Sequence, residues 1–209
     1  MKKKRKGAVA VIIVILLAVL AFAGYNLYRY PARFHSQTDL SLDEAGTEQL
    51  RAEIAAMEDK KVLVAYFSYS GNTRAVAQSL AELTHGDLFE ISPREDYSNV
   101  YTQSNSEIRR RSRPELDAAV EDMGNYDIVF VGYPVWWHAT PAPVNSFLES
   151  YDLTGKLVIP FCTSGGSDIS ETMPTFLGSC EGAAVYGGRR ITNASQLEGW
   201  LTDLNLGLI

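Results

Sequence analysis

The sequence has few of the residues from which structural cross-links and metal sites are built. Its 209 residues include two cysteines, Cys162 and Cys180, and three histidines. Two cysteines exclude a disulfide-rich scaffold. They leave two interpretations open, a single bridge in an oxidising compartment or two small buried apolar side chains. No spacing of Cys, His and carboxylate residues is typical of a metal site, so we expect no bound metal.

Acidic residues are absent from the first 38 positions, where basic and apolar residues take their place. Five basic residues at positions 2–6 precede an uncharged run, Gly7 to Leu27, which is just long enough to cross a bilayer as a helix. Residues 1–30 are therefore predicted to be a cytoplasmic basic tail and a single transmembrane anchor in the cell membrane, with the remaining domain extracytoplasmic. A cleaved signal peptide and a secreted protein are the alternative, because Ala21-Phe22-Ala23 matches a cleavage site.

The rest of the chain has an excess of acidic residues. All 25 acidic residues and 13 of the 19 basic residues lie in residues 31–209, which gives a net charge of about −12. This charge argues against a nucleic-acid partner and favours a basic protein partner or a cationic surface. Residues 31–60 are interpreted as a polar stalk with weak helical periodicity at Leu50, Ile54 and Met57. We place the boundary of the globular domain, residues 61–209, near Lys60.

The segment Lys61–Arg74, KVLVAYFSYSGNTR, lacks the residues of the two common nucleotide-binding loops. It has one glycine and no lysine between its predicted strand and helix, whereas those loops need a lysine or three glycines. Instead, a strand at Val62–Phe67 leads through a run of small and hydroxyl residues into a helix. The first N–H groups of a helix have no internal partners and lie at the positive end of its dipole. The segment therefore predicts a site for an anion such as a phosphate.

Beyond this segment, strand and helix patterns alternate. Further strands are predicted at residues 87–93, 126–135, 156–162 and 183–191, and further helices at 107–123, 143–151, 171–177 and 195–206, with a long loop at 94–106. Right-handed crossovers between such strands give an α/β doubly wound parallel sheet of five strands, with helices on both faces.

Ligands of such sheets bind beyond the carboxyl ends of the strands. After the third strand, Trp136 and Trp137 are adjacent in a loop that also contains three prolines. A rigid aromatic loop at this edge is typical of a platform for a flat heterocycle. After the fourth strand comes a donor-rich loop, residues 163–167 (TSGGS).

These three loops together resemble those of the flavodoxin-like family, above all its short-chain branch with tandem tryptophans, over residues 61–191. The resemblance implies strand order 2-1-3-4-5 and a bound FMN. It assigns the phosphate to Ser68, Ser70, Gly71, Asn72 and Thr73, the isoalloxazine ring to Pro134, Val135, Trp136 and Trp137, and the ring's pyrimidine side to Thr163, Ser164, Gly165 and Gly166. His138, beside the tryptophans, is a candidate proton donor. The fourth-strand loop carries a single acid, Asp168, which does not favour a very low redox potential.

The resemblance implies a membrane-anchored FMN protein that transfers electrons between redox partners, either proteins or small acceptors. One alternative is an NAD(P)H-dependent quinone or FMN reductase, and a second is a flavin-free binding module on the same fold. An extracytoplasmic domain would not meet cytoplasmic nicotinamides. In that case electrons would come through a membrane redox protein, unless the topology is inverted.

Overall fold

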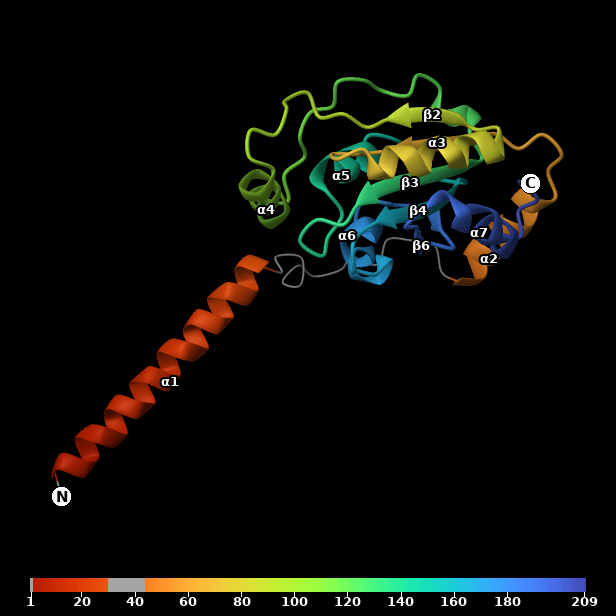
Figure 1. Ribbon diagram of the computed structural model, residues 1–209. Helices are drawn as coiled ribbons and strands as arrows, with labels where there is room; N and C mark the ends of the chain where they lie inside the picture. The colour runs from red at the N-terminus through yellow and green to blue at the C-terminus, as the bar shows by residue number, and fades with distance from the viewer. Residues whose placement is uncertain (1, 30–43) are drawn as a thin grey trace.

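The computed structural model describes residues 2–29 and 44–209 (Figure 1). Its α-helices are α1 (Lys2–Arg29), α2 (Glu44–Ala55), α3 (Asn72–Thr84), α4 (Val100–Arg110), α5 (Ala142–Glu149), α6 (Met173–Leu177) and α7 (Leu197–Leu204). Its strands are β1 (Val62–Tyr66), β2 (Asp87–Glu90), β3 (Ile128–Pro134), β4 (Leu157–Thr163), β5 (Ala184–Val185) and β6 (Arg189–Arg190). Short 3₁₀ turns lie at η2 (Met123–Asn125), η3 (Ile169–Glu171) and η4 (Ala194–Gln196).

The strands form one parallel sheet in the order β2-β1-β3-β4-β5, which confirms the predicted fold and strand order. The last strand differs in detail from the prediction, because residues 183–191 are not one continuous strand. β5 pairs with β4 at residues 157–158 and β6 pairs with β4 at residues 161–162. Between them the chain leaves the ladder around Gly187, whose φ of +60° is a left-handed conformation that interrupts an extended strand.

Both faces of the sheet are buried, as expected of a parallel sheet. Alternate residues of the central strands pack against α2, α3 and α7 on one face and against α5 and α6 on the other (Figure 1). Trp200 of α7 lies edge-on to Phe130 and Phe161 in the first of these layers. This packing fixes the ends of the strands, and it therefore also fixes where the loops that follow them begin.

The predicted helix over residues 107–123 is wrong beyond residue 110, and part of the predicted loop 94–106 is helical instead. The helix α4 begins after Asn99, whose side chain accepts a hydrogen bond from the N–H of Thr102 (3.2 Å). It buries Ser104 and Ile108 and ends where Arg111 adopts a left-handed φ of +53°. Its inward face is partly polar, so the sequence gives it little apolar periodicity.

The segment interpreted as a polar stalk also needs correction. Residues 44–55 form the helix α2, whose Ile54 is only 1% exposed and belongs to the core layer formed with α3 and α7. The packed unit therefore begins before Lys60. The weak periodicity at Leu50 and Ile54 marks the stripe that packs against the sheet. Residues 30–43 of the predicted tail and stalk lie outside the described residues.

The helix α1 extends away from the sheet (Figure 1). Among the described residues, Val11–Arg29 is the one helix long and apolar enough to cross a membrane, with a mean hydropathy of 2.4 and none of that window buried. The same properties fit a signal sequence.

The cysteines are both free and fully buried, which decides between the two interpretations of these residues. Burial raises the pKa of the Cys162 thiol to about 12, so it stays protonated and acts as a small apolar side chain.

Candidate functional site

The loop between β1 and α3 presents unpaired donors at the carboxyl edge of the sheet. Gly71 precedes the helix with φ +90°, and no side chain caps this end of α3. The first N–H groups of α3 therefore remain available to a ligand. The N–H of Gly71 donates to Ser68 Oγ (3.2 Å), and Asn72 Nδ2 donates to Ser70 Oγ (3.3 Å). Hydroxyls and N–H groups are thus gathered in one short turn.

A hydrogen bond joins this loop to the end of β4. The hydroxyls of Thr73 and Thr163 lie 2.8 Å apart, and Thr73 is buried. Thr163 also pairs with Pro134 in the β3–β4 register, so the loops after β1, β3 and β4 meet at one place. The Thr73 hydroxyl, predicted to contact phosphate, is shared with Thr163. Thr73 therefore also connects the loop after β1 to the loop after β4.

A cavity of about 680 Å³ lies between these loops. It is lined by eight of the predicted residues: Ser70, Asn72, Pro134, Val135, Trp136, Thr163, Ser164 and Gly165. Ser68 instead lines a neighbouring cavity of about 490 Å³, and Gly71, Thr73, Trp137 and Gly166 line neither. No charged side chain among the described residues lines the larger cavity. The cavity is therefore uncharged, and its lining combines polar side chains with the indole of Trp136.

Part of the cavity wall comes from residues that the sequence reasoning missed. They are Ala75, Val76 and Ser79 of α3 and, after β6, Ile191, Thr192, Asn193 and Ala194. The second group follows the last strand of the sheet. Because ligands of parallel sheets lie at the carboxyl ends of the strands, the end of the fifth predicted strand is the sequence signal for this group.

The two tryptophans have different surroundings. Trp136 lies edge-on to Phe67, Tyr69 and Tyr97, with ring centroids 5.1, 5.9 and 5.3 Å away. These contacts hold its indole at the wall of the cavity. Trp137 faces away, and its Nε1 donates to Ser104 Oγ of α4 (2.9 Å). The structure therefore brings only Trp136 together with the hydroxyl loop.

The tryptophan turn, residues Trp136–Ala139, has an unusual backbone. Trp136 and Ala139 exchange backbone hydrogen bonds of 3.2 and 2.9 Å, while Trp137 and His138 adopt φ values of +53° and +59°. Two successive positive φ values are typical of a type I′ turn, which favours Asn and Gly. Residues with side chains in such conformations cost about 1 kcal/mol or more each, and persist where their surroundings hold them.

His138 is held by a carboxylate from the 3₁₀ turn η3. Its Nδ1 contacts Oε2 of Glu171, and this interaction holds the pKa of the Glu171 carboxyl below its usual range. The other carboxylate oxygen of Glu171 accepts from the N–H of Asp168 (3.0 Å). His138 lines a separate cavity of about 300 Å³, in which Trp137 also takes part. Its neighbour Glu171 was not anticipated from the sequence.

Residues 61–204 match the family model described as flavodoxin. The chain belongs to the flavodoxin family. Among solved structures it is similar to a candidate flavoprotein from Bacteroides eggerthii, with 35% identity over 70% of this chain and 98% of that one, and a TM-score of 0.64. It is also similar to a flavoprotein from Lactobacillus acidophilus solved in complex with FMN, with 26% identity over 68% of this chain and 99% of that one, and a TM-score of 0.58.

One curated relative introduces a specific activity. It is the NAD(P)H dehydrogenase (quinone) of Acidovorax ebreus, 32% identical over 94 residues, which are 43% of this chain and 45% of that protein. The match therefore spans less than half of the length of that relative.

Proposed function

We propose that this protein binds FMN at the carboxyl edge of its sheet and transfers electrons between redox partners. The observation that carries the proposal is the uncharged cavity of about 680 Å³ that the loops after β1, β3 and β4 form together. Its volume lies within the range of small-molecule sites. When bound, FMN would supply the electron-transfer chemistry, and the protein would bind and orient it.

The donors that line the cavity, together with those beside it in the same loops, fit the two ends of such a cofactor. Ser68, Ser70, Gly71, Asn72 and Thr73 would hold the phosphate through hydroxyls and the free N–H groups of α3. Pro134, Val135 and Trp136 would lie against the flat ring, with Trp137 behind them, and Thr163, Ser164, Gly165 and Gly166 would meet its polar edge. The FMN complex of the Lactobacillus acidophilus relative supports this assignment.

We further propose that α1 is retained as a membrane anchor with its N-terminus in the cytoplasm, so that the domain lies outside the cell membrane. Support comes from the span Val11–Arg29, with its mean hydropathy of 2.4, and from the basic residues that precede it. The redox partner would then be a membrane protein or a small acceptor, and nothing in the acidic domain favours nucleic acid. A C-terminal reporter that is active in only one compartment would test the topology.

The cofactor is tested with the full chain, purified in detergent after expression with riboflavin. We expect a yellow protein whose bound flavin is identified as FMN by mass spectrometry, at close to one per chain. A colourless protein that takes up no FMN at high concentration would contradict the proposal. That result would favour the flavin-free binding module.

A second candidate function is NAD(P)H-dependent reduction of a quinone or of FMN. The 32% identity to part of a quinone dehydrogenase favours it. Steady-state assays with NADH or NADPH and a quinone distinguish the two functions. Turnover without any added reductase would favour the enzyme, and turnover only in the presence of a second redox protein would favour the electron carrier.

A further inference from the structure

The C-terminal end of α1 contacts the domain beside the candidate site. Asn105 Nδ2 of α4 donates to the backbone carbonyl of Tyr28 (2.7 Å). The ring of Tyr28 lies edge-on to Trp137 with centroids 5.6 Å apart, and the guanidinium carbon of Arg29 lies 5.5 Å from the centre of the same indole. A hydrogen bond, an aromatic contact and a cation–π contact thus join the end of the span to the tryptophan turn.

Buried polar groups of α4 support this junction. Ser104 and Asn105 are 2% and 3% exposed. Asn105 bonds across the junction to Tyr28, whereas Ser104 holds Trp137, the indole that Tyr28 and Arg29 contact. The last carbonyl groups of a helix lack internal partners, and the Asn105 amide satisfies one of them. Buried polar side chains that are paired in this way indicate a packed contact rather than a chance approach.

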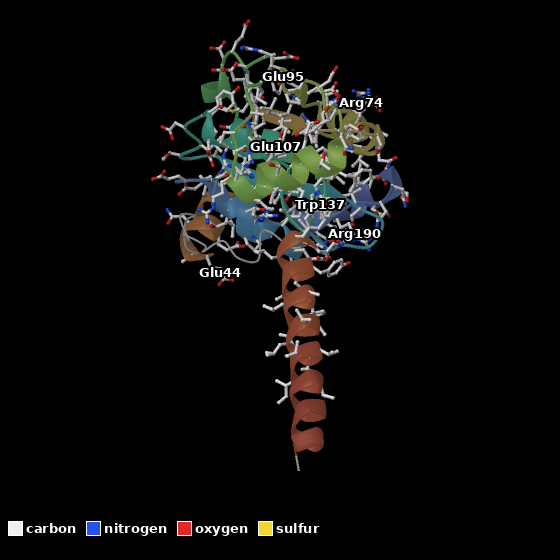
Figure 2. All side chains as sticks on the ribbon, turned by 90° about the vertical axis from the view of Figure 1, so that its left-hand side faces the viewer. Glu44, Arg74, Glu95, Glu107, Trp137 and Arg190 are labelled. Atoms are coloured by element: carbon white, nitrogen blue, oxygen red, sulfur yellow. The ribbon has the colours of Figure 1, made fainter. Side chains whose placement is uncertain are left out.

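The junction sets how the domain lies relative to the span. Figure 1 shows α4 and the end of α1 on the side toward which the strands point, and Figure 2, viewed from that side, shows Trp137 beside the end of α1. If α1 crosses a bilayer, the open edge of the candidate site faces the membrane surface. Aromatic residues suited to that interface are present there, namely Tyr25 and Tyr28 of α1 and Tyr101 of α4, which is 72% exposed.

A cleft of about 300 Å³ opens at this junction. Arg29, Tyr69, Tyr101, Trp137 and His138 help to line it, as do Val135 and Trp136. Those last two residues also line the larger cavity, so a single layer of side chains separates the two spaces. The cleft therefore offers aromatic faces, one guanidinium and one imidazole within reach of both the membrane and the proposed flavin.

We propose that this cleft binds the head group of a lipid-soluble quinone taken from the membrane, and that Arg29 donates a hydrogen bond to one of its carbonyl oxygens. The flat ring suits the aromatic lining, and the apolar tail remains in the lipid. The proposal deepens the proposed function and rests on it, since it names the acceptor of an anchored FMN protein. In this proposal, the end of α1 contributes a side chain to the quinone site in addition to anchoring the domain.

Binding is measured with the full chain in phosphatidylcholine vesicles that contain increasing amounts of a menaquinone, followed by quenching of tryptophan fluorescence. We expect saturable quenching that Arg29→Gln weakens by about tenfold, the effect of losing a hydrogen bond from a charged donor. The matched control is Arg109→Gln, an exposed arginine of α4 outside the cleft. It should leave quinone affinity unchanged, and both variants should keep the wild-type FMN content.

Orientation is tested with vesicles of brominated phosphatidylcholine, which quench only nearby indoles. Trp137→Phe should lower the quenched fraction, whereas Trp200→Phe, which removes a buried indole of α7, should not. Equal quinone binding by Arg29→Gln and wild type, in protein that contains FMN, would overturn this inference and leave the proposed function intact. Protein without FMN would overturn the proposed function and this inference together.

Discussion

The hydroxyl loop, residues Ser68–Thr73, and the tryptophan turn, residues Trp136–Ala139, lie at the same edge of the sheet but are built in opposite ways. Apart from Tyr69, the hydroxyl loop has small side chains, which bond within the loop or to Thr163, and it has free N–H groups at the start of α3. The tryptophan turn has large side chains, two positive φ values and partners from α4 and η3.

This difference shows two ways of making a site. The hydroxyl loop keeps its donors open, so a ligand can satisfy them, and its shape depends on one glycine. The tryptophan turn has its polar groups already paired, so it presents a fixed surface. Substitutions in the first region should change affinity for charged ligands, and substitutions in the second should change stability and the position of the rings.

The largest effect should come from a negative charge in the hydroxyl loop. Ser70→Asp places a carboxylate at the wall of the proposed phosphate site. Like charges about 4 Å apart repel by about 4 kcal/mol at an effective dielectric constant of about 20. Because Ser70 is exposed and solvent screens part of this repulsion, we expect the Kd for FMN to rise by about 100-fold. Fluorescence titration of apoprotein measures this change.

Riboflavin, which lacks the phosphate, is the control ligand for Ser70→Asp, and its affinity should change little. Ser98→Asp is the control variant, because Ser98 is exposed and lines neither cavity of the site. An equal loss for FMN and riboflavin would contradict the assignment of Ser70 to the phosphate.

The next effect concerns the paired groups of the tryptophan turn. Ser104→Ala removes the acceptor of the Trp137 Nε1 hydrogen bond at a buried position. An unsatisfied buried donor costs about 1–3 kcal/mol. We therefore expect the free energy of unfolding to fall by about 1–2 kcal/mol in urea denaturation. The ratio of FMN to riboflavin affinity should stay at the wild-type value, because the hydroxyl loop is unchanged.

A double-mutant cycle of Ser104→Ala with Trp137→Phe separates this hydrogen bond from the change in helix propensity at position 104. A coupling energy of about 1 kcal/mol is expected. Additive effects of the two substitutions would show that the contact contributes nothing to stability.

An effect of similar size should follow from adding a side chain to the glycine of the hydroxyl loop. At Gly71, with φ +90°, a Cβ would meet no atom within 4 Å, so the cost of Gly71→Ala is one of backbone conformation alone. That cost is about 1–2 kcal/mol, and FMN affinity should fall with it by up to about tenfold. Gly124→Ala is the control, since that glycine also has open space around it and has no positive φ. Equal effects of the two substitutions would contradict a special role for the Gly71 backbone.

The same contrast explains which parts of the molecule could be predicted from the sequence. The first four strands and the order of strand, loop and helix around Ser68–Thr73 depend on neighbouring residues, such as Val62–Phe67, and local patterns predict them. The surroundings of Trp137 and His138 depend on Ser104 and Glu171, each 33 positions away. No local pattern indicates such partners.

The misplaced helices have related causes. The helix α4 buries Ser104 and Asn105, polar residues that pair only in the folded chain, so its inward face carries little hydrophobic signal. The helix α2 contributes essentially one fully buried apolar residue, Ile54, and its polar remainder resembles a solvated segment. In both cases tertiary contacts, not local propensity, decide the structure.

The smallest effect should be a pH dependence within the tryptophan turn. The contact with His138 lowers the pKa of Glu171. A carboxyl with a lowered folded-state pKa stabilises the fold above its usual pKa of about 4.3, and this contribution disappears as the pH falls through the folded value. Glu171→Gln removes that contribution but retains an oxygen that can accept from the N–H of Asp168. The variant should therefore lose less stability than wild type between about pH 5 and pH 3. Because both side chains are partly exposed, the difference should stay below about 1 kcal/mol.

Glu82→Gln, on the exposed face of α3, serves as the control and should follow the wild-type profile. If Glu171→Gln also follows it in urea titrations across this range, the pairing with His138 does not stabilise the turn, and its positive φ values must be held by the Trp137 contacts alone.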